Sequence, residues 1–84
     1  MDKFLIKFAR LGILDGVKLS LELGANIHAD NDYAIQMAAN NGHLEIVKYL
    51  VEQGINIHST NNLAFRCASH YGHLEIVKYL KGLK

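Results

Sequence analysis

Apolar residues recur at helical spacing in two short stretches in the middle of the chain. One stretch carries them at Ala34, Ile35, Ala38 and Ala39, and the next at Leu44, Val47, Leu50 and Val51. Apolar side chains three and four positions apart form one face of an amphipathic helix. The pattern therefore predicts two short helices in succession, each with one face to bury.

The residues that flank these stretches are of the types that start and stop helices. Asp32 precedes the first stretch and is predicted to be its N-cap, because a carboxylate can accept hydrogen bonds from the first free N–H groups. Gly42 separates the stretches and Gly54 follows the second, where glycine can adopt the positive φ of a tight turn or a C-cap. The same signals recur elsewhere in the chain, at Asn62 and Gly72 and at Asp2, Gly12 and Gly24.

The chain repeats itself with a period of 30 residues. The sequence Gly-His-Leu-Glu-Ile-Val-Lys-Tyr-Leu occurs unchanged at residues 42–50 and 72–80, and residues 1–30 fit the same register more loosely. A fixed period in the range of about 20 to 50 residues is typical of a solenoid, in which each unit buries its apolar face against its neighbours. The sequence thus predicts a single all-α domain over residues 1–84, made of units 1–30, 31–60 and 61–84.

This unit resembles the ankyrin repeat. The resemblance lies in Ala-Ala-x-x-Gly-His-Leu-Glu-Ile-Val-Lys-Tyr-Leu followed by Gly-x-Asn-Ile, and it covers the whole chain. The family's usual unit is about 33 residues long and opens its first helix with Thr-Pro-Leu-His, whereas the units here are shorter and read Tyr33-Ala34-Ile35-Gln36 and Leu63-Ala64-Phe65-Arg66. This short, proline-free form is similar to the ankyrin-repeat proteins of giant amoeba viruses, of which mimivirus is an example. The resemblance implies a solenoid of three helix-turn-helix units with short loops, and a non-catalytic adaptor that binds another protein.

The charge of the chain bears on whether it binds nucleic acid or membranes. The formal net charge is +1, which gives no overall attraction to nucleic acid or to acidic membranes. The second unit carries −2 (Lys48 against Asp32, Glu45 and Glu52), and the third carries +3 (Arg66, Lys78, Lys81 and Lys84 against Glu75). Weak nucleic-acid contact through the basic third unit is therefore an alternative function.

No feature of the sequence points to a secreted or membrane-spanning protein. The single cysteine, Cys67, cannot form an internal disulfide, and the apolar run Phe4-Leu5-Ile6 is interrupted by Lys7 and Arg10 before it could act as a signal. No stretch reaches the length of about 20 apolar residues that a bilayer requires. We expect an intracellular protein of the cytoplasm, which would be the host cytoplasm if the chain is viral.

Five histidines raise the question of a metal site. His43 and His73 open the second helices, where the resemblance implies a structural role, while His28 and His58 occupy neighbouring loops. Adjacent helices lie roughly 10 Å apart, whereas zinc needs its nitrogen ligands about 2.0–2.1 Å away. We therefore expect no metal and no cofactor.

Catalysis is not expected either. Cys67 aligns with Met37, and soft apolar residues at matched positions commonly fill space. A nucleophilic Cys67 would need an orienting base and a third group, and His70 is the only candidate base nearby. The sequence contains no glycine-rich phosphate loop and no triad arrangement, so the chain is predicted not to be an enzyme.

Positions that differ between the second and third units are the candidates for recognition. The resemblance implies that first helices and loops line a concave surface that contacts a partner protein. Tyrosine and arginine are enriched among the residues that dominate such binding. Carried over by position, the predicted partner-binding residues are Tyr33, Gln36, Asn40, Arg66, His70 and Tyr71.

The two ends of the chain differ from the middle. Phe4 and Phe8 stand where the other units have alanine, which indicates that the first unit is an N-terminal cap. The last unit keeps the internal apolar pattern, so an exposed C-terminal face at Ile76, Tyr79 and Leu80 is expected. The adaptor is therefore expected to bind its partner protein through the concave surface or through this uncapped C-terminal face. The face also gives two alternatives, self-association through the C-terminal unit and a structural repeat without a selected partner.

Overall fold

The computed structural model describes residues 2–54 and 63–82 of the chain. Every regular element in this part is an α-helix, which confirms the all-α prediction. The helices are α1 (Asp2–Leu11), α2 (Leu14–Glu22), α3 (Ala29–Asn40), α4 (Leu44–Glu52), α5 (Leu63–His70) and α6 (Leu74–Lys81).

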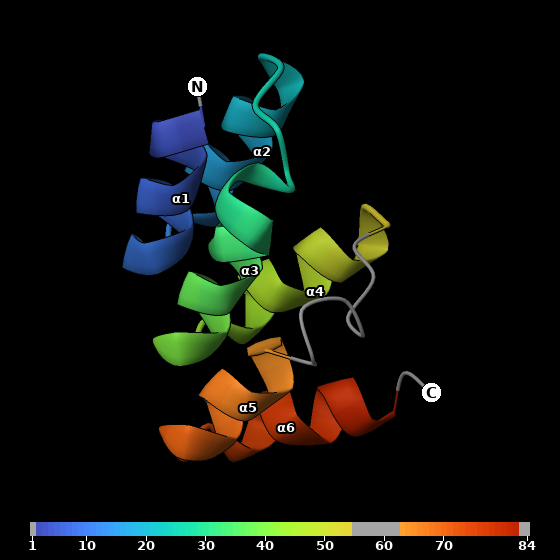
Figure 1. Ribbon diagram of the computed structural model, residues 1–84. Helices are drawn as coiled ribbons and strands as arrows, with labels where there is room; N and C mark the ends of the chain where they lie inside the picture. The colour runs from blue at the N-terminus through green and yellow to red at the C-terminus, as the bar shows by residue number, and fades with distance from the viewer. Residues whose placement is uncertain (1, 55–62, 83–84) are drawn as a thin grey trace.

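The helices form three pairs stacked one on another. Figure 1 shows α1 with α2 at one end of the stack, α3 with α4 in the middle, and α5 with α6 at the other end. The first helices of the pairs pack closely on each other, α1 on α3 and α3 on α5, whereas the second helices approach each other far less. The stack is therefore tight along one side and open along the other.

The turn inside each pair is a Schellman motif. The N–H of His43 donates to the carbonyl of Ala38 over 2.9 Å, and the N–H of Gly42 donates to Ala39. Gly42 has a φ of 79°, as predicted, because this conformation strains any residue with a Cβ. The first of these bonds recurs from Ile13 to Phe8 and from His73 to Ala68, so the three turns are built alike.

Asp32 is not the N-cap of the first helix of its pair. Helix α3 begins at Ala29, with His28 at the N-cap position, and Asp32 lies inside the helix with a φ of 63°. Aspartate tolerates this left-handed conformation better than most residues. Its buried carboxylate instead pairs with Nδ1 of His28, so the aspartate fixes the loop before the helix. The cap predicted at Asn62 lies outside the described residues.

Small residues let the first helices approach. Ala34, Ala38, Ala64 and Ala68 are buried between α3 and its neighbours, with Ala38 and Ala68 fully inaccessible. The larger core side chains come mainly from the second helices and fill the space behind the alanines, including Val17, Ile46, Val47, Leu50, Ile76 and Leu80. Burial of apolar surface of this kind is the main driving force for folding.

The prediction of an exposed face at Ile76, Tyr79 and Leu80 is wrong for two of the three residues. Ile76 is 1% exposed and Leu80 is 4% exposed, because α6 turns these side chains inward onto α5 and the alanines of the core. Tyr79 is half-buried beside α4, where Lys48 lies over its ring. The exposed apolar residue of this helix is Leu74, at 68%.

In unit one the large core side chain lies on the first helix and the small residues on the second, the reverse of the other units. We call this the volume exchange. Phe8 stands where the other units have alanine. Gly16 stands where they have isoleucine, and Ser20 where they have leucine, and both residues are buried. A Cβ on Gly16 would lie 2.4 Å from Cγ of Phe8, so the ring occupies the space that an isoleucine fills elsewhere. The large residue has moved from the second helix to the first, and the core stays filled.

Adjacent units are joined by a histidine that reaches back to the preceding turn. Nε2 of His43 lies 2.9 Å from the carbonyl oxygen of Arg10, and Nε2 of His73 lies 2.9 Å from that of Asn40. Because the carbonyl can only accept, Nε2 carries the proton in both. Each ring also lies against a glycine: a Cβ on Gly12 or Gly42 would come within 2.6 or 2.8 Å of Cε1 of the histidine. We call this contact the histidine latch.

A second contact bridges the more widely separated second helices. Nζ of Lys18 lies 5.4 Å from the ring centre of Tyr49, and Nζ of Lys48 lies 5.6 Å from that of Tyr79. Cations at this distance from an aromatic face contribute roughly 0.5–1 kcal/mol at exposed sites. The repeated nine-residue block therefore supplies both halves of two inter-unit contacts, the glycine and the histidine, and the lysine and the tyrosine.

The volume exchange in unit one predicts a strong coupling between two substitutions. Gly16→Ile should lower the free energy of unfolding by about 1–3 kcal/mol, because the new side chain overpacks against Phe8. Phe8→Ala should also destabilise the chain, by opening a cavity. The double variant restores the pairing found in unit two, so in urea denaturation it should be more stable than the sum of the single effects by at least about 1 kcal/mol. Additive effects would show that the two sites are independent.

The histidine latch predicts that equivalent glycines differ in their tolerance of alanine. Gly42 and Gly72 have φ values of 79° and 75°, so alanine meets the same backbone strain at both. Only at Gly42 does the new Cβ meet a ring, since a Cβ on Gly72 has no atom within 4 Å. Gly42→Ala should therefore destabilise the chain by about 1–3 kcal/mol more than Gly72→Ala. Equal midpoints of chemical denaturation for the two variants would contradict the latch.

Candidate partner-binding face

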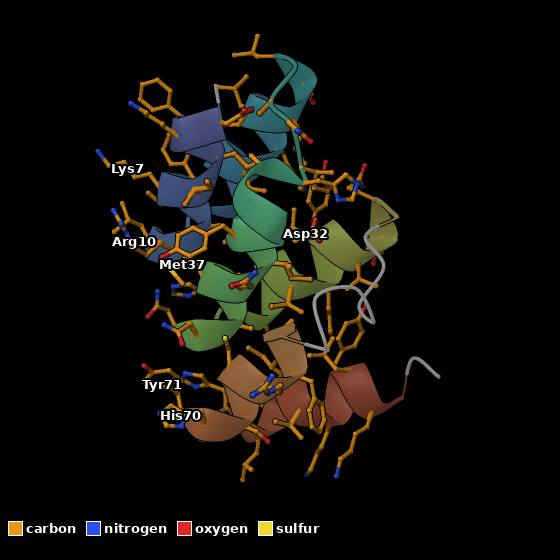
Figure 2. The ribbon with its side chains drawn as sticks, viewed as in Figure 1. Lys7, Arg10, Asp32, Met37, His70 and Tyr71 are labelled. Atoms are coloured by element: carbon orange, nitrogen blue, oxygen red, sulfur yellow. The ribbon has the colours of Figure 1, made fainter. Side chains whose placement is uncertain are left out.

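The exposed side of the three first helices presents corresponding positions of each repeat next to one another. Since the period is 30, Lys7, Met37 and Cys67 are equivalent, as are Arg10, Asn40 and His70. Figure 2 shows Lys7, Arg10, Met37, His70 and Tyr71 along the same side of the stack. We call this surface the first-helix face, and its described residues are Lys7, Arg10, Tyr33, Gln36, Met37, Asn40, Asn41, Arg66, Cys67, His70 and Tyr71.

Four of the six predicted partner-binding residues meet around one shallow pocket. Its volume is about 390 Å³, and it lies between the end of α3 and the exposed side of α5. Tyr71 is 56% exposed and makes an edge-to-face contact with His70, with ring centres 4.8 Å apart. The aromatic pair forms one part of the wall and a guanidinium another. The lining residues are Asn40, Arg66, Cys67, His70 and Tyr71.

The other two predicted residues lie outside this pocket. Tyr33 is 39% exposed and Gln36 is half-buried, both nearer the start of α3 than Asn40 is. They belong to the first-helix face, but they do not line the pocket with the other four. A ligand that contacted all six residues would therefore have to extend along α3 from the pocket.

Lys7 and Arg10 belong to this face but were absent from the sequence-based prediction. That prediction compared only the second unit with the third, because the first unit matches the repeat more loosely. Placing unit one in the same register would have found both residues, since they are equivalent to Met37 and Asn40. The backbone of Arg10 is itself held in place, because its carbonyl accepts from His43 and from the side chain of Asn41 at 3.2 Å.

The first-helix face is basic. Lys7, Arg10 and Arg66 are exposed on it. The acidic side chains described in α1 and α3 are engaged in local contacts: Oδ1 of Asp2 accepts from the N–H of Asn26 at 2.7 Å, and Asp32 pairs with His28. Among the described residues of the first-helix face, the charged side chains are all basic.

Cys67 lies in the wall of the pocket but lacks the environment of a nucleophile. Partial burial raises the pKa of the Cys67 thiol, and the nearby charge of Arg66 lowers it by less. A raised pKa reduces the fraction of thiolate, which is the reactive form. The thiol thus contributes a soft, uncharged surface next to the rings of His70 and Tyr71.

Three of the four histidines described by the structure are placed in structural contacts, and the fourth, His70, lines the pocket. His43 and His73 form latches, and His28 pairs with Asp32. Within residues 2–54 and 63–82, no three side chains of histidine, cysteine, aspartate or glutamate are grouped as a metal site would require. His58 lies outside the described residues.

Comparison with models of known protein families identifies the family of this chain. A family model described as ankyrin repeats, in three copies, matches residues 5–83. The chain belongs to the ankyrin-repeat family. Its pairs of short helices, glycine turns and histidine latches are thus this chain's version of the ankyrin solenoid.

Two relatives are proteins of Acanthamoeba polyphaga mimivirus. The ankyrin repeat protein R634 is 42% identical over 41 residues, which make up 49% of this chain and 8% of the relative. The ankyrin repeat protein R602 is 44% identical over 43 residues, 51% of this chain and 14% of the relative. The chain thus spans only a small part of the length of these relatives. The resemblance to the ankyrin proteins of giant amoeba viruses is confirmed.

No described helix has the combination of length and apolar character that is needed to cross a bilayer.

The environment of Cys67 predicts slow alkylation. Because burial raises its pKa, the protonated thiol is favoured in the folded chain, and its rate of reaction with iodoacetamide should rise at a higher pH than in urea-unfolded chain. The measurement is the alkylation rate across pH 7–10, followed by mass spectrometry. A folded-state profile at lower pH than the unfolded one would instead identify an activated cysteine.

Proposed function

We propose that this chain is a non-catalytic adaptor that binds an acidic segment of a partner protein through its first-helix face. Ankyrin repeats are generally protein-interaction modules. The observation that carries the proposal is the pocket of about 390 Å³ lined by Asn40, Arg66, Cys67, His70 and Tyr71. Its residues come from two adjacent units, so stacking of the units creates it.

The side chains around the pocket are suited to a peptide anchor. Arg66 can form two parallel hydrogen bonds to one carboxylate, a geometry that makes such pairs both strong and specific. Tyr71 presents a large ring that loses little conformational entropy on binding, and Asn40 can donate to or accept from a peptide backbone. A partner segment with an acidic residue next to an apolar one would satisfy all three.

Charge complementarity along the stack favours an acidic partner. Lys7 and Arg10 continue the positive surface from the pocket towards α1, while Asp2 and Asp32 are held in local contacts. Complementary charge raises the rate of association and excludes wrong partners. Tyr33 and Gln36, at the other end of α3, would contact the flanking part of a longer segment.

We further propose that the adaptor acts inside the cell, in the cytoplasm, which would be that of the host if the chain is viral. The single cysteine, which cannot form an internal disulfide, is compatible with a reducing compartment.

A random peptide library displayed on phage tests the proposal directly. Selection on the immobilised chain should enrich peptides rich in aspartate and glutamate, and Arg66→Ala with Tyr71→Ala should weaken the best peptides by about tenfold or more, since such residues commonly dominate binding. The measurement is the dissociation constant of a labelled peptide by fluorescence anisotropy. Enrichment without acidic residues, or equal binding to the variant, would overturn the proposal.

A control variant that loses more positive charge elsewhere separates this face from the remaining basic surface. Lys78→Ala with Lys81→Ala removes two positive charges from α6, away from the pocket, and should leave peptide affinity within about twofold. The rival function, nucleic-acid contact, is tested with a labelled single-stranded oligonucleotide in the same assay. Tight oligonucleotide binding that is lost in the Lys78→Ala, Lys81→Ala variant but kept in the Arg66→Ala, Tyr71→Ala variant would favour nucleic-acid contact instead.

A further inference from the structure

The positive charges of the first-helix face are divided between the two ends of the stack. Lys7 and Arg10 lie on α1 in unit one, and Arg66 lies on α5 in unit three, and all three side chains are exposed. Among the described residues of this face, those that unit two contributes are uncharged. The face is therefore basic in unit one, neutral in unit two and basic again in unit three.

Two rows of equivalent positions cross the three first helices, because the sequence repeats with a period of 30. The rows are Lys7, Met37, Cys67 and Arg10, Asn40, His70. Figure 2 shows the labelled members of both rows following one another along one side of the stack. Each row begins with a cationic side chain in unit one and ends in the wall of the pocket in unit three.

The packing of the first helices sets the distance from one unit to the next along these rows. Helix α1 packs on α3, and α3 packs on α5, with the inaccessible Ala38 and Ala68 in the core between the units. The axes of helices packed directly on each other lie about 8–10 Å apart. The charges of unit one are therefore two such steps, or about 16–20 Å, from the layer that carries Arg66.

A peptide segment in the polyproline II conformation has a repeat of matching length. This conformation has three residues per turn and rises about 3.1 Å per residue, so every third side chain points the same way, about 9 Å farther on. A segment lying across the first helices would thus present residues i, i+3 and i+6 to three successive units. Its backbone makes no internal hydrogen bonds, which leaves those groups available to Asn40 in the middle of the path.

We propose that the acidic partner segment crosses the three first helices in an extended, polyproline II conformation and carries two acidic residues six positions apart, with an apolar residue midway. One carboxylate pairs with Arg66 at the pocket, and the other pairs with Lys7 and Arg10. The apolar residue packs on Met37, whose flexible, polarisable side chain is half-buried. This inference rests on the proposed function and specifies which acidic segments the same face selects.

The crossing path contacts both groups of positive charge, which a path along α3 does not. A segment that followed α3 from the pocket would run towards Tyr33 and Gln36 and would leave the charges of unit one without a contact. Once the first ion pair has formed, a second one on the same segment forms at a high effective concentration, provided that the spacing matches. A segment with the wrong spacing can form only one of the two pairs at a time.

A series of synthetic peptides tests the spacing. The peptides are labelled with a fluorophore, built on proline and serine, and equal in length and charge, and each carries one leucine and two glutamates that are three, six or nine positions apart. In about 0.15 M salt, the dissociation constant from fluorescence anisotropy should be lowest at a spacing of six, by at least about fivefold relative to three. A lowest value at three or nine would contradict the proposed path.

A helical peptide tests the other conformation that a partner segment could adopt. At about 1.5 Å per residue, an α-helix needs two glutamates about thirteen positions apart to span the same 20 Å. An alanine-based peptide of this design, with the same charge and label, should bind more weakly than the extended peptide with a spacing of six. Tighter binding of the helical peptide would overturn the proposal.

Matched variants of the protein identify the second ion pair. Lys7→Ala with Arg10→Ala should raise the dissociation constant of the spacing-six peptide to that of the spacing-three peptide, and should change the latter by less than about twofold. Lys78→Ala with Lys81→Ala removes the same charge from α6 and should keep the preference for a spacing of six. Loss of the preference in both variants would show that it reflects overall charge and not the crossing path.

The same experiment separates this inference from the proposed function. If acidic peptides bind equally at every spacing and Arg66→Ala weakens all of them, the acidic partner stands and the crossing path is wrong. If no acidic peptide binds, both fail. The substituted residues are exposed, so the circular dichroism spectra of the variants should match that of the unaltered chain.

Discussion

The histidine rings that the second and third units lay on the turn glycine of the unit before them hold the helix pairs in register. The ring requires a glycine on one side and a carbonyl acceptor on the other, and both come from the end of the preceding first helix. Because first helices pack tightly while second helices stand apart, this contact and the lysine–tyrosine contact fix the stack at its two sides. The first-helix face exists only because the units are held this way.

Much of the fold follows from the sequence because the period fixes the register of every position. Apolar spacing gives the helices, the turn glycines give their ends, and the exact repetition of residues 42–50 points to stacking contacts that each unit must both offer and receive. Four of the six predicted binding residues also meet at one pocket, since repeat register places variable positions of neighbouring units side by side.

The parts that were missed depend on which side chains contact each other in space, which the repeat pattern alone does not give. Periodicity alone marks Ile76 and Leu80 as apolar but does not say that they turn inward while Leu74 stays exposed. The start of α3 depends on the contact between His28 and Asp32, which no local helix signal reveals. Phe8 was interpreted from the sequence as a sign of an N-terminal cap, and the pattern did not show that its ring fills the space beside Gly16.

In each internal unit the glycine serves one neighbour and the histidine serves the other. If one whole 30-residue unit is removed or duplicated, the turn glycine of one unit again meets the histidine of the next, and the stack forms without further substitution. If only part of a unit is lost, the glycine and the histidine no longer meet. Recombination can therefore change the length of such an array in steps of 30 residues at little cost to stability, and the spacing of units should drift more slowly through evolution than their number.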